Sequence, residues 1–191
     1  MNDPIIRAAL REKFESDATM LVDEFSIARG YVRADLAILT ESFFVGIEIK
    51  SIRDTLARLP RQIEQYDEAF DQCLLVVEGE KHLGKLGSML PAHWGLWQAY
   101  EEDGVCKFKV IKAPETNSAN KAAVLTHMLW REEAYEVAKE LGVGVGMSSA
   151  SRGKLIKAVN EVVRRDKAKA RKIVLTAMKS RELGRWAQIN G

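Results

Sequence analysis

Asp35, Glu48 and Lys50 stand in or beside two apolar runs of the sequence, "ADLAIL" and "FFVGIEIK". A soluble chain seldom places three such charges in core strands unless it uses them. Two carboxylates that lie near each other need a cation, and their hard oxygen atoms favour Mg²⁺ or Mn²⁺. A neighbouring ammonium group can stabilise charge that develops on a phosphate, or hold the attacking water. The three residues therefore predict a centre for metal-assisted hydrolysis.

Strand periodicity predicts that these side chains converge. Successive side chains point to opposite faces of a strand, so Glu48 and Lys50 should project together from a strand over residues 43–50. Asp35 belongs to the preceding strand, over 31–39, and the short turn between the two makes them antiparallel neighbours. Asp35 is then near Glu48 or Lys50 across the ladder. The alternative is a salt bridge at a sheet edge, with Asp35 near a turn as a cap.

The spacing D-x12-E-x-K of Asp35, Glu48 and Lys50 resembles the PD-(D/E)XK nuclease superfamily. "RAD" stands where the superfamily has "PD", which is a common relaxation. The similarity is best over residues 24–77 and indicates a compact bacterial and phage branch. It implies that Asp35, Glu48 and the main-chain carbonyl of Ile49 hold Mg²⁺ or Mn²⁺. It also implies that Lys50 orients or deprotonates the attacking water.

Two further elements extend the resemblance. Gln62 and Tyr66 in "RQIEQYDEAFD" are similar to the Q-x-x-x-Y element of RecB-type nucleases, and on a helix they share one face. They would position backbone or substrate near the metal. Glu24, eleven residues before Asp35, occupies the place of an upstream acid and is the candidate to complete the metal shell or hold a second ion. The alternative for Gln62 and Tyr66 is an ordinary helix face that packs on the sheet. The alternative for Glu24 is a solvent-exposed strand residue without a role in the site.

The periodicity of the whole chain predicts an α/β fold in the order α-βββ-α-β-α-ββ, followed by helices. The ranges are helix 4–16, strands 22–28, 31–39 and 43–50, helix 54–71, strand 73–79, helix 80–90, a closing hairpin around "DG", and helices 118–141, 149–165 and 167–183. A turn is expected at 28–30. The helical crossover favours parallel pairing of strands 43–50 and 73–79. Ser51 is expected to cap the helix that follows it; the alternative is contact with a phosphate. The order matches a restriction-endonuclease-like core, with a mixed central sheet flanked by helices and a C-terminal helical extension.

The net charge of +2 hides an asymmetry. Residues 151–191 contain twelve Lys/Arg and three acidic residues, a charge of +9, which leaves −7 for residues 1–150. A basic segment on an acidic body indicates an anionic polymer as partner; the alternative is a pair of solvated helices. We expect a nuclease-like domain over 1–114 and a basic helical region over 115–191. The residues expected to hold the phosphate backbone without reading sequence are Arg152, Lys154, Arg164, Arg165, Lys167, Lys169, Arg171 and Lys172.

Composition narrows the class of protein. The chain has 191 residues and is 47% hydrophobic, which suits one domain or one domain with an appendage. Its N-terminus lacks the apolar stretch of a signal peptide, and no run of about 18 apolar residues exists, so we expect a cytoplasmic protein without membrane contact. Cys73 and Cys106 form no metal-type pair and should be reduced core or near-core residues.

The expected function is that of a metal-dependent nuclease that hydrolyses phosphodiester bonds, with DNA as the expected substrate. Two alternatives stay open. One is a catalytically weak or inactive nucleic-acid-binding module, and the other is a phage or bacterial protein-interaction domain on the same fold. The oligomeric state is also open, and a homodimer is one possibility.

Overall fold

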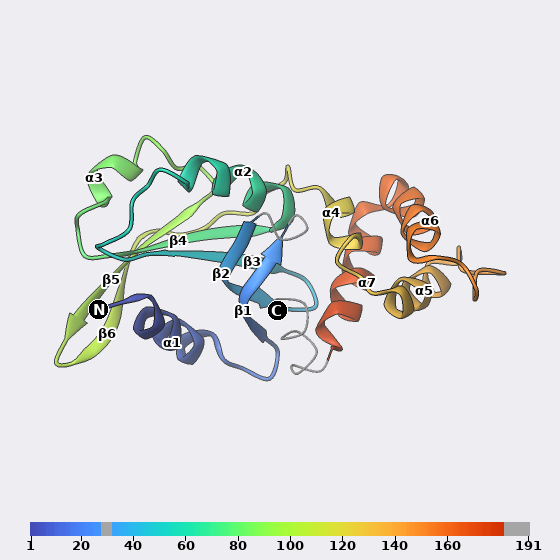
Figure 1. The fold of residues 1–191 in the computed structure, drawn as a ribbon, viewed down its shortest axis with the longest axis horizontal. Coiled ribbons are helices and arrows are strands. Elements are labelled where there is room, and N and C mark those ends of the chain that lie inside the picture. Colours follow the sequence, from blue (N-terminus) through green and yellow to red (C-terminus); the bar gives the residue numbers. More distant parts are fainter. Residues whose placement is uncertain (28–31, 182–191) are drawn as a thin grey trace.

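The structure is a computed structural model that describes residues 1–27 and 32–181 (Figure 1). The predicted turn at 28–30 and the predicted end of the last helix at 183 lie outside these residues. Within the described ranges, no helix is long and apolar enough to cross a membrane. The elements are α1 (Asp3–Phe14), β1 (Met20–Ile27), β2 (Val32–Leu39), β3 (Phe44–Lys50), α2 (Leu59–Ala69), β4 (Gln72–Glu78), α3 (Leu83–Leu86), β5 (Gly95–Glu102), β6 (Val105–Lys112), α4 (Ala122–Thr126), α5 (Arg131–Glu140), α6 (Arg152–Arg165) and α7 (Lys167–Lys179).

A single mixed sheet has its six strands in the order β1-β2-β3-β4-β5-β6. Strands β1, β2 and β3 pair antiparallel, β4 lies parallel to both β3 and β5, and β5 and β6 form an antiparallel hairpin. The predicted meander, the parallel pairing across the α2 crossover and the closing hairpin are therefore confirmed. The chain is an α/β protein with a parallel centre and antiparallel edges.

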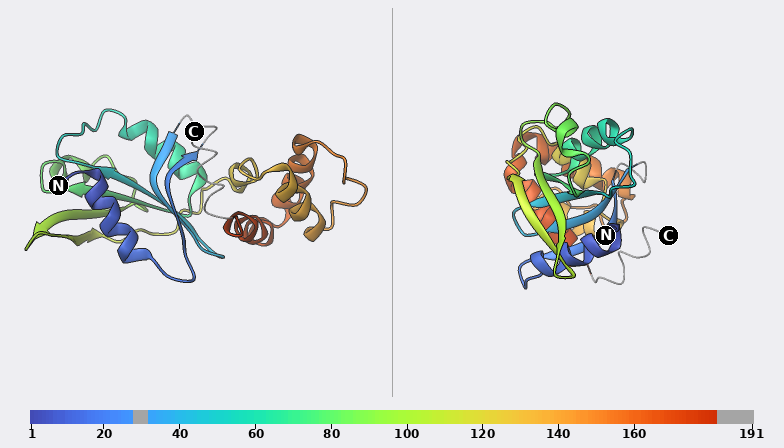
Figure 2. Two further views of the ribbon diagram at one scale, coloured as in Figure 1. Left: turned by 60° about the horizontal axis from the view of Figure 1, so that its bottom comes forward. Right: turned by 90° about the vertical axis from the view of Figure 1, so that its left-hand side faces the viewer.

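Helices α1 and α2 cover opposite faces of the sheet (Figure 2). Leu10 of α1 is buried in one apolar cluster together with Ile47 of β3, whereas Ile63 of α2 is buried in a second cluster on the other face. Because side chains alternate along a strand, Glu48 and Lys50 point to the face that α2 covers. Strand β3 is thus covered on both sides, and any charged side chain that it carries is withdrawn from water.

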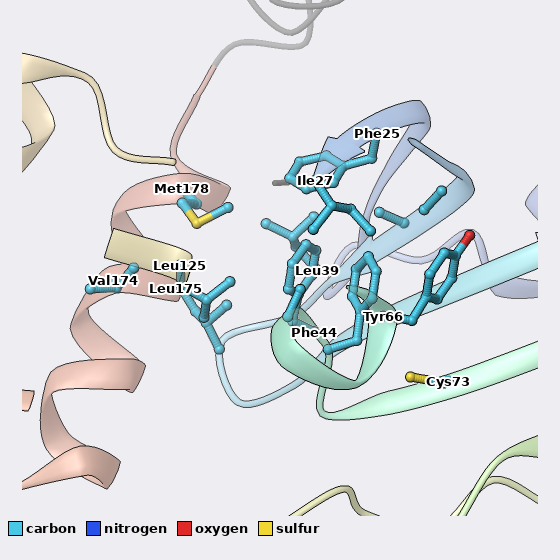
Figure 3. Packing of buried hydrophobic residues seen from close by; sticks show 14 of the residues in the cluster. Phe25, Ile27, Leu39, Phe44, Tyr66, Cys73, Leu125, Val174, Leu175 and Met178 are labelled. Atoms are coloured by element: carbon cyan, nitrogen blue, oxygen red, sulfur yellow. The ribbon is translucent and has the colours of Figure 1, made fainter. Parts of the chain in front are cut away.

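Helices α4 to α7 pack on one another beside one end of the sheet, and α4 and α7 lie nearest to it (Figures 1 and 3). Leu125 of α4 and both Leu175 and Met178 of α7 belong to the same buried cluster as Leu39 and Phe44. Leu39 ends β2 and Phe44 begins β3, so the helices meet the sheet at the β2–β3 turn. The apolar core is therefore continuous from the sheet into the C-terminal helices.

A buried ion pair fastens α7 to the sheet. The Arg171 guanidinium Nη2 lies 2.7 Å from the Asp71 Oδ2, and both side chains are about 9% exposed. The Asp71 carboxylate also accepts hydrogen bonds from the Phe44 main-chain N–H (2.8 Å) and from the Asn120 amide (2.7 Å). Arg171 was predicted to bind phosphate. Its burial in this pair is a correction, because the side chain holds the fold together and does not face solvent.

Two of the predicted helices are wrong in extent. The apolar spacing over 118–141 predicts a single helix, but α4 ends at Thr126 and α5 begins only at Arg131. The side chain of Glu133 accepts a hydrogen bond from the Trp130 N–H at 2.7 Å, which caps the start of α5. The helix predicted over 80–90 likewise shortens to α3, Leu83–Leu86.

The segment after β3 also differs from its prediction. A helix was expected from residue 54, but α2 begins at Leu59, flanked by Arg58. Asp54 accepts the Ser51 N–H at 2.7 Å, and the Asp54 N–H donates to the Ser51 carbonyl at 3.1 Å, so these residues form a turn. Ser51 therefore does not cap α2, and that preferred interpretation is wrong. Pro60 falls in the first helical turn, where its missing N–H costs least.

Candidate active site

A closed polar network around Glu48 forms the centre of the candidate site. The Lys50 Nζ lies 2.5 Å from Glu48 Oε1, and these residues are only 5% and 2% exposed. The Gln62 amide joins both of them, since its Nε2 donates to Glu48 Oε1 at 2.5 Å and its Oε1 accepts from Lys50 at 3.1 Å. The Tyr66 hydroxyl donates to Glu48 Oε2 at 2.7 Å. The structure thus brings four of the predicted residues together.

The spacing of α2 explains this convergence. Gln62 and Tyr66 are four residues apart and lie on one face of the helix, above the β3 face that carries Glu48. Tyr66 is fully buried, and burial together with the negative charge of Glu48 raises its pKa well above the usual range. The hydroxyl therefore keeps its proton and acts as a donor. It fixes one oxygen of Glu48 while Lys50 and Gln62 hold the other.

Asp35 lies beside Glu48, as the strand periodicity predicts. The pairing of Leu36 with Ile47 puts Asp35 level with Glu48 on the neighbouring strand. The Ile49 N–H donates to Asp35 Oδ2 at 2.6 Å. Burial and the nearby charge of Glu48 raise the pKa of Asp35 to about 7, against the opposing effect of the Ile49 N–H. Two carboxylates therefore share this position with one ammonium group.

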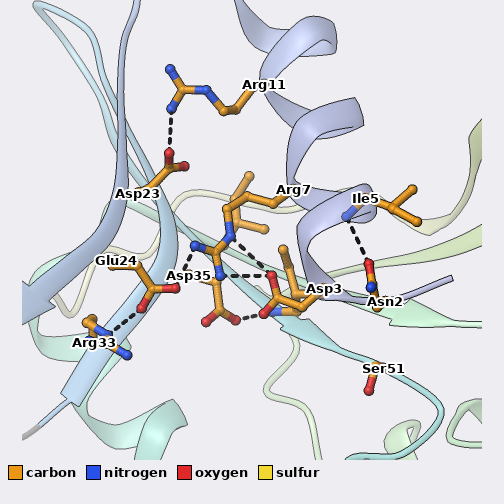
Figure 4. A network of polar contacts seen from close by, with 12 residues as sticks. Asn2, Asp3, Ile5, Arg7, Arg11, Asp23, Glu24, Arg33, Asp35 and Ser51 are labelled. Atoms are coloured by element: carbon orange, nitrogen blue, oxygen red, sulfur yellow. Dashed lines mark hydrogen bonds and ion pairs between the residues drawn. The ribbon is translucent and has the colours of Figure 1, made fainter.

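Glu24 is held by two arginines at the edge of this site (Figure 4). Its Oε1 lies 2.5 Å from the Arg7 Nη1, and its Oε2 pairs with Arg33. Its φ of 53° is the left-handed conformation, which is strained for a non-glycine residue within a strand. Both oxygens of the predicted additional ligand are thus occupied by guanidinium groups, and its role in metal binding stays a prediction.

Asp3 and Arg7 of α1 are the residues that sequence reasoning missed. Arg7 donates to Asp3 Oδ1 through Nε (3.1 Å) and Nη2 (2.8 Å), and Asp3 is close enough to Asp35 to raise its pKa further (Figure 4). The i, i+4 spacing and the start signal "NDP" were visible in the sequence. Which face of α1 meets β2 depends on helix docking, so no signal in the sequence linked Asp3 to Asp35.

The oxygen atoms of this site fit a magnesium-type ion. Asp35 and Glu48 provide carboxylates: Asp35 accepts one N–H from Ile49, whereas both oxygens of Glu48 already accept hydrogen bonds from Lys50, Gln62 or Tyr66. In residues 1–27 and 32–181 no group of three or more His, Cys, Asp or Glu is placed to hold a metal ion. Mg²⁺ commonly uses one or two carboxylates and completes its shell with water and substrate phosphate. Two carboxylates are thus a donor set that Mg²⁺ or Mn²⁺ could use, whereas structural zinc needs four protein ligands.

The cations predicted to bind phosphate differ in their surroundings. Arg152 and Lys167 donate to main-chain carbonyls of the preceding segments, and Arg164 pairs with a glutamate on its own helix. Arg171 is buried against Asp71. The others are exposed on α6 and α7: Lys154, Arg165, Lys169 and Lys172. Helix α7 lies near the β2–β3 turn and α6 lies beyond it, whereas Lys50 is at the opposite end of β3 from that turn (Figure 1).

Comparison with known proteins assigns the chain to a family. The family model described as bacteriophage P4 protein cII matches residues 3–185. The chain belongs to this family. No curated protein matches the sequence. Among solved structures, SfsA from Pyrococcus furiosus, in complex with Ca²⁺, is similar at 14% identity and a TM-score of 0.32. The likeness covers 59% of this chain and 61% of SfsA, less than two thirds of that protein's length, and it is too distant to assign a fold.

Proposed function

We propose that the chain is a metal-dependent nuclease, with DNA as the expected substrate, on a restriction-endonuclease-like core. The observation that carries this proposal is the buried network of Glu48, Lys50, Gln62 and Tyr66 with a second carboxylate, Asp35, beside it. These are the positions that carry the resemblance to the PD-(D/E)XK superfamily.

The energetics of burial favour this function over a structural salt bridge. Withdrawing an ion pair from water is costly, and an apolar pair of similar volume is often at least as stable. Glu48 and Lys50 would already balance each other as a structural pair. Asp35 adds a second carboxylate at the same place, and its ionisation creates an excess of negative charge, which burial and then the charge of Glu48 oppose by raising its pKa to about 7. A divalent cation would relieve that excess, which a packing role would not require.

Each residue of the site would have a separate role in phosphodiester hydrolysis. A bound Mg²⁺ or Mn²⁺ supplies Lewis-acid polarisation of the phosphate and a more acidic bound water. Asp35 and Glu48 would hold it, with the Ile49 carbonyl that the superfamily resemblance implies. Lys50, fixed by Glu48 and Gln62 at 2.5 and 3.1 Å, would orient the attacking water and stabilise negative charge on the phosphate.

The supporting residues would act by fixing geometry. Tyr66 holds Glu48 Oε2 and so keeps the carboxylate in one orientation. Asp3, kept beside Asp35 by Arg7, is a better placed third carboxylate than Glu24, whose oxygens both pair with arginine. If a metal were bound, Asp3 would accept hydrogen bonds from its water ligands.

A substrate panel tests the proposed function. The full chain is incubated with linear, circular, nicked and branched DNA, and with RNA, in Mg²⁺, in Mn²⁺ and in EDTA. We expect cleavage that needs the metal and is lost in Glu48→Gln, which keeps the shape of the side chain and removes its charge. Absence of cleavage of every substrate in both metals, by folded protein, would overturn the proposal. Equal cleavage by wild type and Glu48→Gln would overturn the assignment of the site.

A further inference from the structure

We propose that Arg53, Arg58 and Arg61 bind backbone phosphates of the nucleic-acid strand that enters the active site. The three arginines belong to residues 51–61, which link β3 to the start of α2 and are called the entry segment here. The proposal rests on the nuclease function proposed above, by which the bound strand would be cleaved. It assigns first contact with the substrate to this segment and not to the basic C-terminal helices.

Chain connectivity places the entry segment next to the Glu48 network. The segment begins directly after Lys50 and ends directly before Gln62, and both of those residues contact Glu48. Arg58, Gln62 and Tyr66 follow one another at intervals of four, so they share one face of α2. Tyr66 is fully buried, Gln62 is half-buried and Arg58 is exposed. This row of side chains leads from the catalytic centre out to solvent.

The three arginines are exposed, and Arg58 and Arg53 act only through longer-range attraction on the carboxylates of Asp54 and Glu78. Within residues 1–27 and 32–181, none of them forms an ion pair with a carboxylate. Arg7 and Arg33, on the other side of the site, are by contrast both paired with Glu24. The entry segment is therefore the part of the site's rim whose guanidinium groups are available to an anion.

The entry segment is also held in place before any ligand binds. Asp54 accepts the Ser51 N–H at 2.7 Å, and Glu78 accepts the Ile52 N–H at 2.8 Å. Lys81 donates to the Ile52 carbonyl from the other side. The Ile52 side chain is nevertheless 48% exposed. A turn whose backbone is already anchored loses little backbone freedom on binding, which favours affinity.

The position of the charges works against the stability of α2. The N-terminal end of a helix carries partial positive charge, so cations are unfavourable there and acids are favourable. The first turn of α2 contains no acidic residue. Arg58 and Arg61 are three residues apart and repel each other as neighbours on the helix surface. Asp54, which precedes the helix, offsets part of the charge of Arg58. The charge that remains departs from the local rule, as is expected where a ligand supplies negative charge.

A pair of matched charge variants tests the proposal. The first combines Arg53→Gln, Arg58→Gln and Arg61→Gln. The control combines Lys154→Gln, Arg165→Gln and Lys169→Gln, which removes the same charge from exposed positions of α6 and α7. Binding of a fluorescein-labelled DNA duplex of about 20 base pairs is followed by anisotropy at several salt concentrations in EDTA. Without metal no strand is cut, so binding is measured separately from turnover.

We expect the entry-segment variant to bind at least about tenfold more weakly, with a salt slope smaller by up to about 2 to 3, since each phosphate contact contributes about 0.9. The control should stay within about threefold of wild type. The melting temperature of the entry-segment variant should be equal to or above that of wild type, because repulsion at the start of α2 is relieved. A merely structural role would lower it.

Three results would overturn the proposal. They are no DNA binding by wild type, unchanged affinity and salt slope in the entry-segment variant, or an equal or larger loss in the control. The nuclease function fails in a different way. If the arginine substitutions weaken DNA binding but no substrate is cleaved in Mg²⁺ or Mn²⁺, the proposed binding surface is supported and the proposed nuclease function is wrong.

Discussion

Asp35 should make the metal-free protein less stable as the pH rises. Burial and the charge of Glu48 raise the pKa of this carboxyl to about 7 in the folded chain, whereas an unperturbed aspartate titrates near ~3.9. Between these values the folded protein holds a proton that the unfolded chain has released. The contribution of Asp35 to stability is therefore complete below about pH 4 and is lost as the pH rises through about 7.

The size of the effect follows from the same two values. A difference of roughly 3 pKa units corresponds to about 4 kcal/mol of unfolding free energy, since one unit is worth about 1.36 kcal/mol. Asp35 is partly accessible to solvent, so screening by water makes this an upper limit. Asp35→Asn removes the titration and keeps an oxygen that can accept the Ile49 N–H. The variant should be more stable than wild type at about pH 8, with little difference near pH 4.

Urea unfolding of wild type and Asp35→Asn in EDTA, at several values from about pH 4.5 to 8, measures this difference. Subtracting the two curves cancels the titration of all other groups to first order. Added Mn²⁺ should stabilise wild type most at high pH, where Asp35 is ionised, and should stabilise Asp35→Asn far less. Equal pH dependence in the two proteins would refute the reasoning, because Asp35 would then have an ordinary pKa in the folded state.

Three other substitutions test separate parts of the structure. Arg171→Met should lower the free energy of unfolding by about 3–5 kcal/mol in urea, because it leaves Asp71 buried without its partner; an unchanged value would mean that the pair is not formed. Gly46→Ala should cost about 1–3 kcal/mol, since a Cβ there would lie 2.4 Å from the Phe70 ring; a neutral effect in the same assay would contradict this packing. Tyr66→Phe should reduce the rate of cleavage at least about tenfold, because Glu48 Oε2 loses its hydrogen-bond donor. Cleavage by this variant at the wild-type rate would show that Tyr66 has no role in the reaction.

Much of the fold could be predicted because its elements follow local patterns. The period of two over residues 43–50 puts Glu48 and Lys50 on one face, and the spacing of four between Gln62 and Tyr66 puts them on one face of α2. The hydrogen bonds among these four side chains agree with both inferences. The short connections between the first three strands likewise fixed the meander.

The remaining features depend on contacts between distant parts of the chain. The apolar spacing over 118–141 continues through the break between α4 and α5, so the sequence alone predicts one helix. Arg171 resembles its exposed basic neighbours in sequence, and only the packing of α7 against Asp71 buries it. Asp3 reaches Asp35 because α1 docks on β2 in one particular orientation. Such docking angles are set by the whole core and not by any local window.

Single-turnover cleavage of DNA by wild type and Lys50→Met, in Mn²⁺, tests the central claim most directly. Methionine keeps the apolar length of the side chain, and folding is checked by circular dichroism. The account predicts that the variant cleaves at least about 100-fold more slowly. Its Mn²⁺ affinity by calorimetry should stay within about threefold of wild type, because an ammonium group is not a metal ligand. Cleavage at the wild-type rate by Lys50→Met would contradict the account, since the buried pair with Glu48 would then serve the fold and not the chemistry.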